Sequence, residues 1–303
     1  MIHYVHKGEI RDRNKIVVNK IFSYKAALDI ARSNDNEYEL QTVDECWRRN
    51  DWPIWKEAIQ AKLNSLIKRE VFGLVVRTPE GVLLVGYKWV FVCKRNEKIE
   101  IIKYKVQLVA QGFLQRPSID YEETYAPVMD VVTFKFLISL VVKENLDMWL
   151  MDIVTAYLYG SLDNDIYMKI PRGYKMLETY NSISRSMYSI KLQRSLYRWK
   201  QSGCMWYNRL SECLLKKGFE NNPICPCIFI KKSKSKFAIV AVYVKDLNLV
   251  GTLEKLTKIA NSLKNEFEMK YLGKTKFCLG LQIEHLPNGI LVHQSTYIEK
   301  VLK

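Results

Sequence analysis

Apolar side chains recur at helical spacing between Asp51 and Glu70. Asp is a residue type that caps helix N-termini, and Pro53 fits the first turn of a helix that begins after Asp51. The apolar positions follow the i, i+3, i+4, i+7 spacing of an amphipathic helix and are Trp55, Ala58, Ile59, Leu63, Leu66 and Ile67. The pattern therefore predicts a helix that packs one face onto a core.

The rest of the chain alternates between strand-like and helical patterns. Runs rich in β-branched and aromatic residues predict strands at 71–76, 87–94, 104–113, 148–152, 165–171, 227–232, 239–251 (a hairpin), 276–285 and 289–294. Longer segments predict helices at 131–146, 204–219 and 253–267. Because these elements do not repeat as βαβ units, we expect an α+β fold.

Length and charge narrow the function classes. The chain has 303 residues, is 48% apolar and carries a formal net charge of +15, which is typical of a globular protein with a basic surface. That charge favours a polyanionic partner, nucleic acid ahead of an acidic membrane, and a basic protein without such a partner is the alternative. No run reaches the roughly 18 to 20 apolar residues of a membrane span, and the N-terminus lacks the apolar core of a signal peptide. We therefore expect an intracellular protein that does not enter membranes.

The seven cysteines are scattered, and only Cys225 and Cys227 lie close together in sequence. No second cysteine pair and no histidine set completes a zinc site. Buried, reduced thiols are therefore expected, as in intracellular proteins.

Two acidic residues stand at the ends of apolar strands. Asp152 follows the run MWLM, and Asp246 lies in the centre of the segment IVAVYVKDLNLVG. Each is either a turn or capping acid, or a carboxylate that a rigid sheet presents to a hard cation. Two such carboxylates that converge on Mg²⁺ suit phosphoryl transfer. Sequence spacing alone does not show that the two strands are neighbours.

The order of motifs from about Trp47 to the C-terminus resembles the reverse transcriptase region of copia-type LTR retrotransposon polyproteins. The matching segments are YKWVFVCK, YKVQLVAQGFLQRPSIDYEETYAPV, MDIVTAYLYGSLDNDIYMKIPRGY, SLYRWKQSGCMWYNRL, VYVKDL and YLGKTKFCLGLQIE. The resemblance implies a fingers-and-palm fold whose mostly antiparallel palm sheet is backed by helices. It also implies RNA-directed DNA synthesis from deoxynucleoside triphosphates with two Mg²⁺ ions, on an RNA template with an RNA–DNA or DNA duplex as partner.

The resemblance assigns roles to residues of the expected palm. Asp152 and Asp246 match the catalytic carboxylates that bind the metal ions. Tyr157 matches the aromatic steric gate beneath the sugar of the incoming nucleotide, where a ring clashes with a ribose 2′-hydroxyl. The backbone at Thr155 and Ala156 is expected to face the triphosphate, where N–H groups cradle anionic oxygens. A core aromatic is the alternative for Tyr157.

Three further residues are expected at the nucleotide. Lys105 matches a cation of the fingers near the incoming phosphates, and Gln107 lies on the same face of its predicted strand. Gln201 lies in the segment expected to pack beside template and nucleotide. The alternative for Lys105 and Gln201 is a solvated surface side chain.

The chain departs from the family pattern at its most sensitive position. Where the family has Tyr-Val-Asp-Asp, this chain has Tyr243-Val244-Lys245-Asp246. A charged lysine has hydrogen-bond donors but no lone pair for a cation, so it cannot replace the lost ligand. We therefore predict that polymerase activity is lost or very weak, unless a neighbouring acid such as Asp130 or Glu123 reaches the metal site.

Other departures fall on polar or glycine positions. Gln107 stands where the family has an arginine, Gln111 where it has a lysine, and Cys204 where it has another arginine. Arg198 and Trp199 replace a Gly-Leu pair and add bulk where the backbone approaches substrate. The pattern is that of a degenerate copy whose apolar framework persists.

The expected organisation is a weakly patterned leader at 1–45 and a reverse transcriptase domain at 46–303. Within that domain we expect fingers at about 46–145 and palm at about 146–303, an incomplete thumb, and neither ribonuclease H nor integrase. The alternatives are a non-catalytic, basic nucleic-acid-binding remnant and a product that does not fold stably. The sequence does not indicate an oligomeric state.

Overall fold

The computed structural model describes residues 40, 42–96, 100–162, 164–176, 185–233 and 236–302, with the backbone alone for Lys236 and Lys300. Nearly all of the leader predicted at 1–45 lies outside these residues. The helices are α2 (Val43–Trp47), α3 (Trp52–Lys68), α4 (Val131–Lys143), α5 (Ser202–Lys216), α6 (Leu253–Lys264) and α7 (Ser295–Leu302), with 3-10 turns η1 (Gly112–Leu114), η2 (Ala156–Tyr159) and η4 (Arg185–Met187).

Most strands form antiparallel pairs. They are β1 (Phe72–Arg77), β2 (Tyr87–Arg95), β3 (Ile101–Ala110), β4 (Asp147–Ile153), β5 (Tyr167–Lys169), β6 (Tyr188–Leu192), β7 (Glu220–Asn221), β8 (Ile228–Ser233), β9 (Lys236–Tyr243), β10 (Asp246–Gly251), β11 (Met269–Lys274), β12 (Phe277–Cys278), β13 (Leu281–Leu286) and β14 (Gly289–His293). The largest sheet has six strands in the order β11-β4-β10-β9-β8-β7. Smaller sheets are β1-β6-β5, β12-β13-β14 and the hairpin β2-β3.

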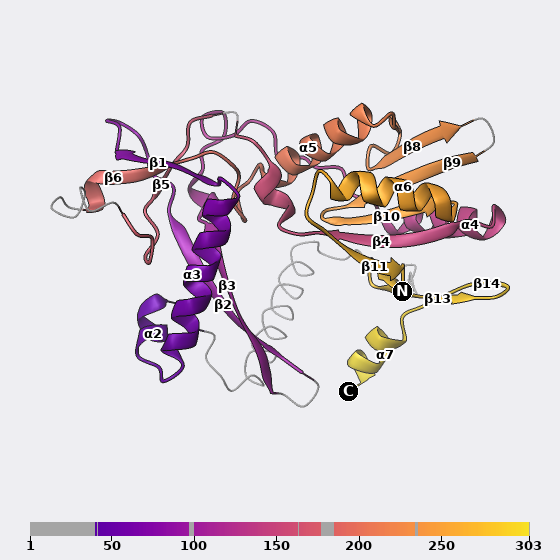
Figure 1. Cartoon of the computed structure of the whole chain (residues 1–303), viewed down its shortest axis with the longest axis horizontal. Helices are drawn as coiled ribbons and strands as arrows, with labels where there is room; N and C mark the ends of the chain where they lie inside the picture. The colour runs from indigo at the N-terminus through magenta and orange to yellow at the C-terminus, as the bar shows by residue number, and fades with distance from the viewer. Residues whose placement is uncertain are drawn as a thin grey trace, which may run out of the picture.

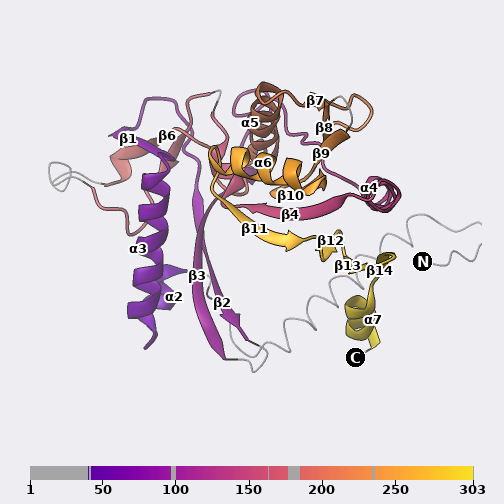
Figure 2. The ribbon, with the colours of Figure 1, turned by 45° about the vertical axis from the view of Figure 1, so that its right-hand side comes forward.

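The six-stranded sheet carries one of two hydrophobic cores. Apolar side chains of α4, α5 and α6 pack against it, including Phe134, Trp206 and Leu256, all almost fully buried. Helices α5 and α6 lie together on one face of the sheet (Figures 1 and 2). This arrangement confirms the predicted α+β class, with a mostly antiparallel sheet backed by helices.

The second core lies under α3, the helix that the apolar pattern predicts. The β2-β3 hairpin packs beside α3, where the ring of Trp55 meets the rings of Phe91 and Tyr104 edge-on at 5.3 and 4.7 Å between centroids. The β1-β6-β5 sheet contributes further side chains to this core, among them Phe72, Met168 and Ile190. Figure 2 shows α3 alongside β2 and β3, away from the six-stranded sheet.

Neither core is continuous in sequence. The core of the large sheet draws on residues 129–156 and 206–283, whereas the second draws on residues 46–110 and 158–199. No single cut therefore separates them, and the fingers and palm limits near residue 145 stay predictions. Within the described ranges, no helix is both long and apolar enough to cross a membrane.

Some predicted elements differ in detail. The strand predicted at 104–113 ends at Ala110, and the strand predicted at 276–285 is divided by Leu279 and Gly280 into β12 and β13. Leu279 and Gly280 both have positive φ, which an uninterrupted strand does not accommodate. Strands β6, β7 and β11 and helix α2 are absent from the predictions.

A backbone contact joins the segment after β3 to the segment before α5. A Cβ placed on Gly112 would lie 2.1 Å from the carbonyl oxygen of Arg198. Arg198 itself has φ +70°, in the left-handed region that glycine adopts most easily. The contact therefore requires that Gly112 has no side chain and that Arg198 has a backbone angle that is unfavourable for a residue other than glycine.

We predict that Gly112→Ala lowers the free energy of unfolding by about 2 kcal/mol or more, because the new methyl group meets rigid backbone. Gly203→Ala is the matched control, since its Cβ would lie 3.4 Å from the Cβ of Ala126, an ordinary contact, in the first turn of α5. The control should change stability by less than about 1 kcal/mol. Urea unfolding of both variants measures the difference, and equal effects would contradict the contact.

We also predict that Arg198→Gly raises the free energy of unfolding by up to about 1 kcal/mol. Glycine relieves the strain of the positive φ, and its larger backbone entropy in the unfolded chain offsets part of the gain. The side chain of Arg198 is exposed, so its loss removes little packing. A lowered urea midpoint for this variant would show that the arginine side chain stabilises the turn.

Candidate active site

Strands β4 and β10 are direct neighbours in the large sheet. Their antiparallel register places Asp246 opposite Asp152, so the two carboxylates leave the same face of the sheet. The structure therefore places the two acid-bearing strands side by side, which sequence spacing alone could not establish.

The turn between β9 and β10 consists of Val244 and Lys245, because Tyr243 pairs with Asp246. Val244 has φ +56°, which is unusual for a β-branched residue. Its carbonyl accepts a 2.7 Å hydrogen bond from the indole of Trp206, and the carbonyl of Lys245 accepts one of 3.0 Å from the N–H of Ile153. These bonds hold a strained turn against α5 and β4.

The ammonium group of Lys245 lies against both carboxylates. It donates a hydrogen bond to Oδ1 of Asp152, and its Nζ is 3.8 Å from Oδ1 of Asp246. Burial alone lowers the pKa of Lys245, but the hydrogen bond to Asp152 and the charges of both acids outweigh burial, so the pKa is raised. The lysine therefore stays charged at neutral pH.

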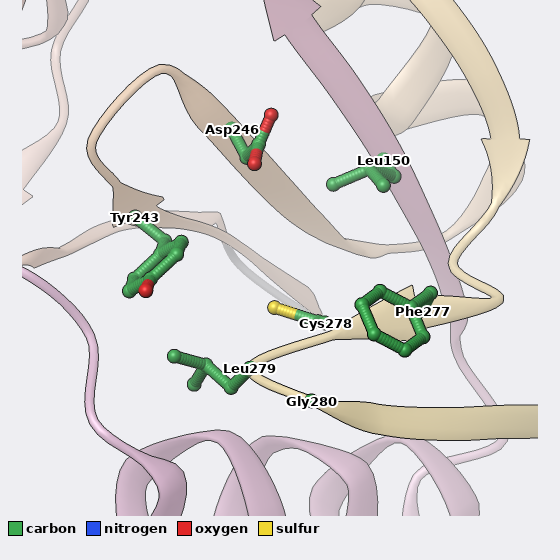
Figure 3. Close-up of a pocket in the computed structure, with 7 residues that line it drawn as sticks. All are labelled: Leu150, Tyr243, Asp246, Phe277, Cys278, Leu279 and Gly280. Atoms are coloured by element: carbon green, nitrogen blue, oxygen red, sulfur yellow. The ribbon is translucent and has the colours of Figure 1, made fainter. Parts of the chain in front are cut away.

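The two acids differ in environment. Burial, supported by the nearby charge of Asp152, raises the pKa of Asp246, and the charge of Lys245 opposes that rise. Asp246 also lines a pocket with Leu150, Tyr243, Phe277, Cys278, Leu279 and Gly280 (Figure 3). The apolar lining explains why the carboxylate is partly removed from water.

Neither neighbouring acid joins this pair. Asp130 caps α4 and accepts a 2.6 Å hydrogen bond from the N–H of Thr133, which lowers its pKa. Glu123 accepts hydrogen bonds from the N–H groups of Tyr125 and Thr124, and these lower its pKa. Across the described ranges, no group of three or more His, Cys, Asp or Glu side chains is placed to hold a metal ion.

The residues after β4 form the turn η2. Thr155 has φ +57° and its hydroxyl donates to the carbonyl of Val154, while Ala156 is buried. Tyr157 is half-buried, and its ring meets the ring of Tyr197 edge-on at 5.5 Å between centroids. Burial raises the pKa of the Tyr157 phenol.

Strand β3 places Lys105 and Gln107 on one face, as predicted, while Val106 and Leu108 point into the core. The field of Lys245 reaches Lys105: burial, then the charge of Lys94, then that of Lys245, lower the pKa of Lys105. The ammonium groups of Lys105 and Lys245 are therefore within electrostatic range of one another.

Gln201 is buried, so the solvated alternative for it is wrong. Its Oε1 accepts a 3.0 Å hydrogen bond from Gln115, and its Nε2 donates one of 3.0 Å to the carbonyl of Asp120. These bonds connect Gln201 to the 115–120 loop and not to the carboxylate pair.

Asn248 is a buried residue that the sequence reasoning missed. Its Oδ1 accepts a 3.0 Å hydrogen bond from Thr275, and its Nδ2 lies 3.5 Å from the sulfur of Cys278. An asparagine two residues after Asp246 in an apolar strand shares its face, and that alternation was the available signal.

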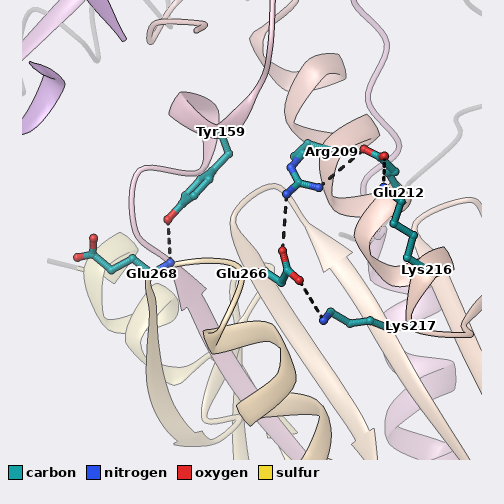
Figure 4. Close-up of polar contacts among 7 residues, drawn as sticks. All are labelled: Tyr159, Arg209, Glu212, Lys216, Lys217, Glu266 and Glu268. Carbon is teal, nitrogen blue, oxygen red and sulfur yellow. Dashed lines mark hydrogen bonds and ion pairs between the residues drawn. The ribbon is translucent and has the colours of Figure 1, made fainter. Parts of the chain in front are cut away.

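A polar network supports the far side of β4 (Figure 4). Glu266 is 3.7 Å from Arg209 and 3.4 Å from Lys217, both on or next to α5. The N–H of Glu268 donates a 2.7 Å hydrogen bond to the hydroxyl of Tyr159. Because β11 follows directly and pairs with β4 at Asp152, the network fixes the strand that carries this acid.

Comparison with known proteins gives the family. The family model described as "Reverse transcriptase (RNA-dependent DNA polymerase)" matches residues 69–303. The chain is 31% identical over 251 residues to the retrovirus-related Pol polyprotein from transposon TNT 1-94 of Nicotiana tabacum, which covers 82% of this chain and 18% of that protein. It is 29% identical to the Pol polyprotein from transposon RE1 of Arabidopsis thaliana over 92% of this chain and 18% of that protein.

The chain thus spans about a fifth of the length of these relatives. A solved structure of telomerase from Candida albicans, in complex with a fragment of telomeric RNA, matches with a TM-score of 0.38 and 11% identity over 79% of this chain and 51% of the other. That likeness is too small to support an argument. By the family match and the relatives, the chain belongs to the reverse transcriptase family of copia-type retrotransposon Pol polyproteins.

Proposed function

We propose that this chain is a reverse transcriptase domain that binds nucleic acid but no longer catalyses efficient two-metal nucleotidyl transfer. The observation that carries the proposal is the position of the Lys245 ammonium against Asp152 and Asp246. The family would use these carboxylates to bind Mg²⁺. Here a side chain of the protein itself provides their counter-charge.

The residues present fit a pair of Mg²⁺ ions poorly. Mg²⁺ requires several oxygen ligands in octahedral geometry, and Lys245 offers none where the family has a carboxylate. Two unit charges about 4 Å apart interact by roughly 4 kcal/mol at an effective dielectric of 20. A doubly charged ion beside the ammonium would therefore meet a repulsion comparable to the attraction of one carboxylate.

Loss of catalysis has a large expected size. Each 1.36 kcal/mol of lost transition-state stabilisation lowers a rate by about tenfold. The loss of one ligand and the addition of one cation change the electrostatic free energy of the metal site by several times this roughly 1.36 kcal/mol. Gln107, in place of an arginine, removes a permanent cation from the phosphate side as well.

Nucleic-acid binding is supported by charge. The net charge of +15 and the half-buried Lys105 on β3 suit a phosphate backbone. Binding of this kind needs neither the missing carboxylate nor a metal ion. The non-catalytic alternative is therefore part of this proposal.

We predict that the unmodified chain does not extend a primer on an RNA template in Mg²⁺, and that Lys245→Asp creates Mg²⁺ binding. Thermal unfolding should shift with Mg²⁺ only in Lys245→Asp, by about 1.4 kcal/mol at a concentration tenfold above Kd. The control is Lys232→Asp, the same charge change at an exposed site on β8 of the same sheet. Robust Mg²⁺-dependent extension by the unmodified chain would refute the proposed loss of catalysis.

We also predict that the unmodified chain binds an RNA–DNA hybrid and that its affinity falls steeply with salt. Each lysine or arginine that neutralises a phosphate steepens the logarithmic salt dependence by roughly 0.9. Fluorescence anisotropy between about 50 and 200 mM salt measures the slope. In this range the Debye length is on the order of 10 Å, so screening changes the attraction between the protein and the phosphates. Absence of binding at the lowest salt would refute the binding part of the proposal.

A further inference from the structure

Two cysteines meet in the tight turn that leads into β8. The N–H of Ile228 donates a 2.9 Å hydrogen bond to the carbonyl of Cys225, so Cys225, Pro226 and Cys227 are the first three residues of a β-turn. The sulfur atoms of Cys225 and Cys227 lie 3.3 Å apart, and neither cysteine is in a disulfide. A disulfide bond is about 2 Å long, so these two atoms need to approach by only roughly 1 Å to form one.

Pro226 restricts the backbone between the two thiols. Its ring fixes its own φ near −65°, a value that suits the second position of a β-turn, and it favours an extended conformation at the preceding residue, Cys225. The carbonyl of Pro226 accepts a 2.8 Å hydrogen bond from the hydroxyl of Tyr207 and a 2.7 Å hydrogen bond from the side chain of Asn221. The turn is therefore held against α5 and β7 before any bond forms between the sulfur atoms.

The main chain of each cysteine is anchored as well. The carbonyl of Cys227 accepts a 2.9 Å hydrogen bond from the N–H of Val242 on β9. The N–H of Cys225 donates a 3.1 Å hydrogen bond to Oδ1 of Asn222. Closure of a bond between the sulfur atoms therefore requires changes in side-chain torsions and leaves the path of the backbone in place.

The two thiols differ in their access to solvent. Cys225 is half-buried and follows Ile224, whose side chain is 94% exposed, whereas Cys227 is only 2% exposed. The hydroxyl of Thr133 lies 3.6 Å from the sulfur of Cys225, where it can donate a hydrogen bond to a thiolate. Burial, followed by the hydrogen bond with Cys225, raises the pKa of the Cys227 thiol. A reagent in solution therefore reacts with Cys225 before Cys227.

The chemistry open to this pair follows from its two sulfur atoms. Structural zinc sites use four protein ligands, and two thiols supply only half of such a set. Among the residues that the structure describes, no group of three or more His, Cys, Asp or Glu side chains is placed to hold a metal ion. Two adjacent thiols are, however, sufficient for a two-electron oxidation to a disulfide.

We propose that Cys225 and Cys227 form a redox site that a low-molecular-weight disulfide, such as glutathione disulfide, oxidises reversibly. The thiolate of Cys225 attacks one sulfur atom of the oxidant, which forms a mixed disulfide and releases one molecule of reduced thiol. Cys227 then loses its proton to solvent, and its thiolate attacks the sulfur of Cys225 and expels the second molecule of reduced thiol. Two cysteine thiols are thus oxidised to one disulfide, and the oxidant is reduced to two thiols.

The length of the enclosed loop indicates a reversible bond more than a structural one. A disulfide between Cys225 and Cys227 would enclose only Pro226, so it would constrain the unfolded chain little and add little stability. The proposal is independent of the proposed function, because it involves neither nucleic acid nor the carboxylate pair of Asp152 and Asp246.

The test equilibrates the unmodified chain with graded ratios of glutathione to glutathione disulfide, followed by alkylation in urea, digestion with trypsin and mass spectrometry. Trypsin releases both cysteines in one peptide, residues 218–231, which contains no other cysteine. After oxidation this peptide should be unalkylated and lighter than the dithiol by two hydrogen atoms, and dithiothreitol should restore the alkylated form. A peptide that remains a dithiol in excess glutathione disulfide would overturn the proposal.

Single variants test the order of attack. Cys227→Ser should stop at the mixed disulfide, so that Cys225 carries one glutathione, whereas Cys225→Ser should leave the buried Cys227 largely unmodified. Cys93→Ser is the matched control, since it removes a half-buried thiol from the second core, and it should form the 218–231 disulfide as the unmodified chain does. Equal attachment of glutathione to Cys225→Ser and Cys227→Ser would overturn the proposed sequence of attack.

A comparison with the unfolded chain requires no variant. Because the turn holds the thiols close together, the folded chain should form the disulfide at a glutathione disulfide level about tenfold or more below that needed in urea. The same peptide measures both states. Equal half-oxidation points for the folded and the urea-unfolded chain would show that the fold does not position the two thiols, and would overturn the site.

Discussion

The register between β4 and β10 is the constraint on which the candidate site depends. Because side chains alternate along a strand, a shift of one residue would move Asp246 to the opposite face from Asp152. The alignment continues along the strands, with Leu247 opposite Met151 and Leu249 opposite Trp149. Leu247, Leu249 and Met151 are buried in the core of the large sheet, so hydrophobic packing fixes the position of the polar pair.

In this sheet, Lys245 affects the charge of the site more than its backbone geometry. The turn forms its hydrogen bonds to Trp206 and Ile153 through backbone carbonyls. Any residue at these two positions has such a carbonyl, whatever its side chain. A lysine at this position is therefore compatible with an intact hairpin and affects only the charge at its tip. The proposed loss of catalysis is thus compatible with a preserved fold, because the apolar contacts that determine the fold and the carboxylates proposed as metal ligands are different atoms.

Sequence patterns predicted the elements whose apolar periodicity is strong. Helix α3 and the hairpin of β9 and β10 lie at their predicted positions. The charged pair of Lys245 and Asp246 marked the tip of that hairpin in the sequence. Strand β11 was not predicted because its sequence, MKYLGK, contains polar residues and a glycine. It is an edge strand of the sheet, and the face of such a strand that is open to solvent does not require apolar residues.

Side-chain environment was harder to predict than element type. Gln201 lies in a polar segment of the sequence, yet its burial follows from the long-range contact with Gln115, which no local pattern reports. Lys62 fits the polar face of α3, yet its side chain is half-buried and its Nζ lies 5.5 Å from the ring centroid of Tyr197, which is far away in sequence. The pairing of Asp152 with Asp246 likewise required the sheet order, although the resemblance to a family indicated it.

The interleaving of the two cores has a consequence for how the chain folds. Residues 158–199 complete the core under α3 only after the chain has passed through β4 of the other core, and α5 then returns to the large sheet. Many native contacts therefore join residues far apart in sequence, which slows folding relative to a chain of local contacts. Neither core can be completed from one uninterrupted fragment, so on a ribosome each core reaches its full stability only after its second segment has been synthesised.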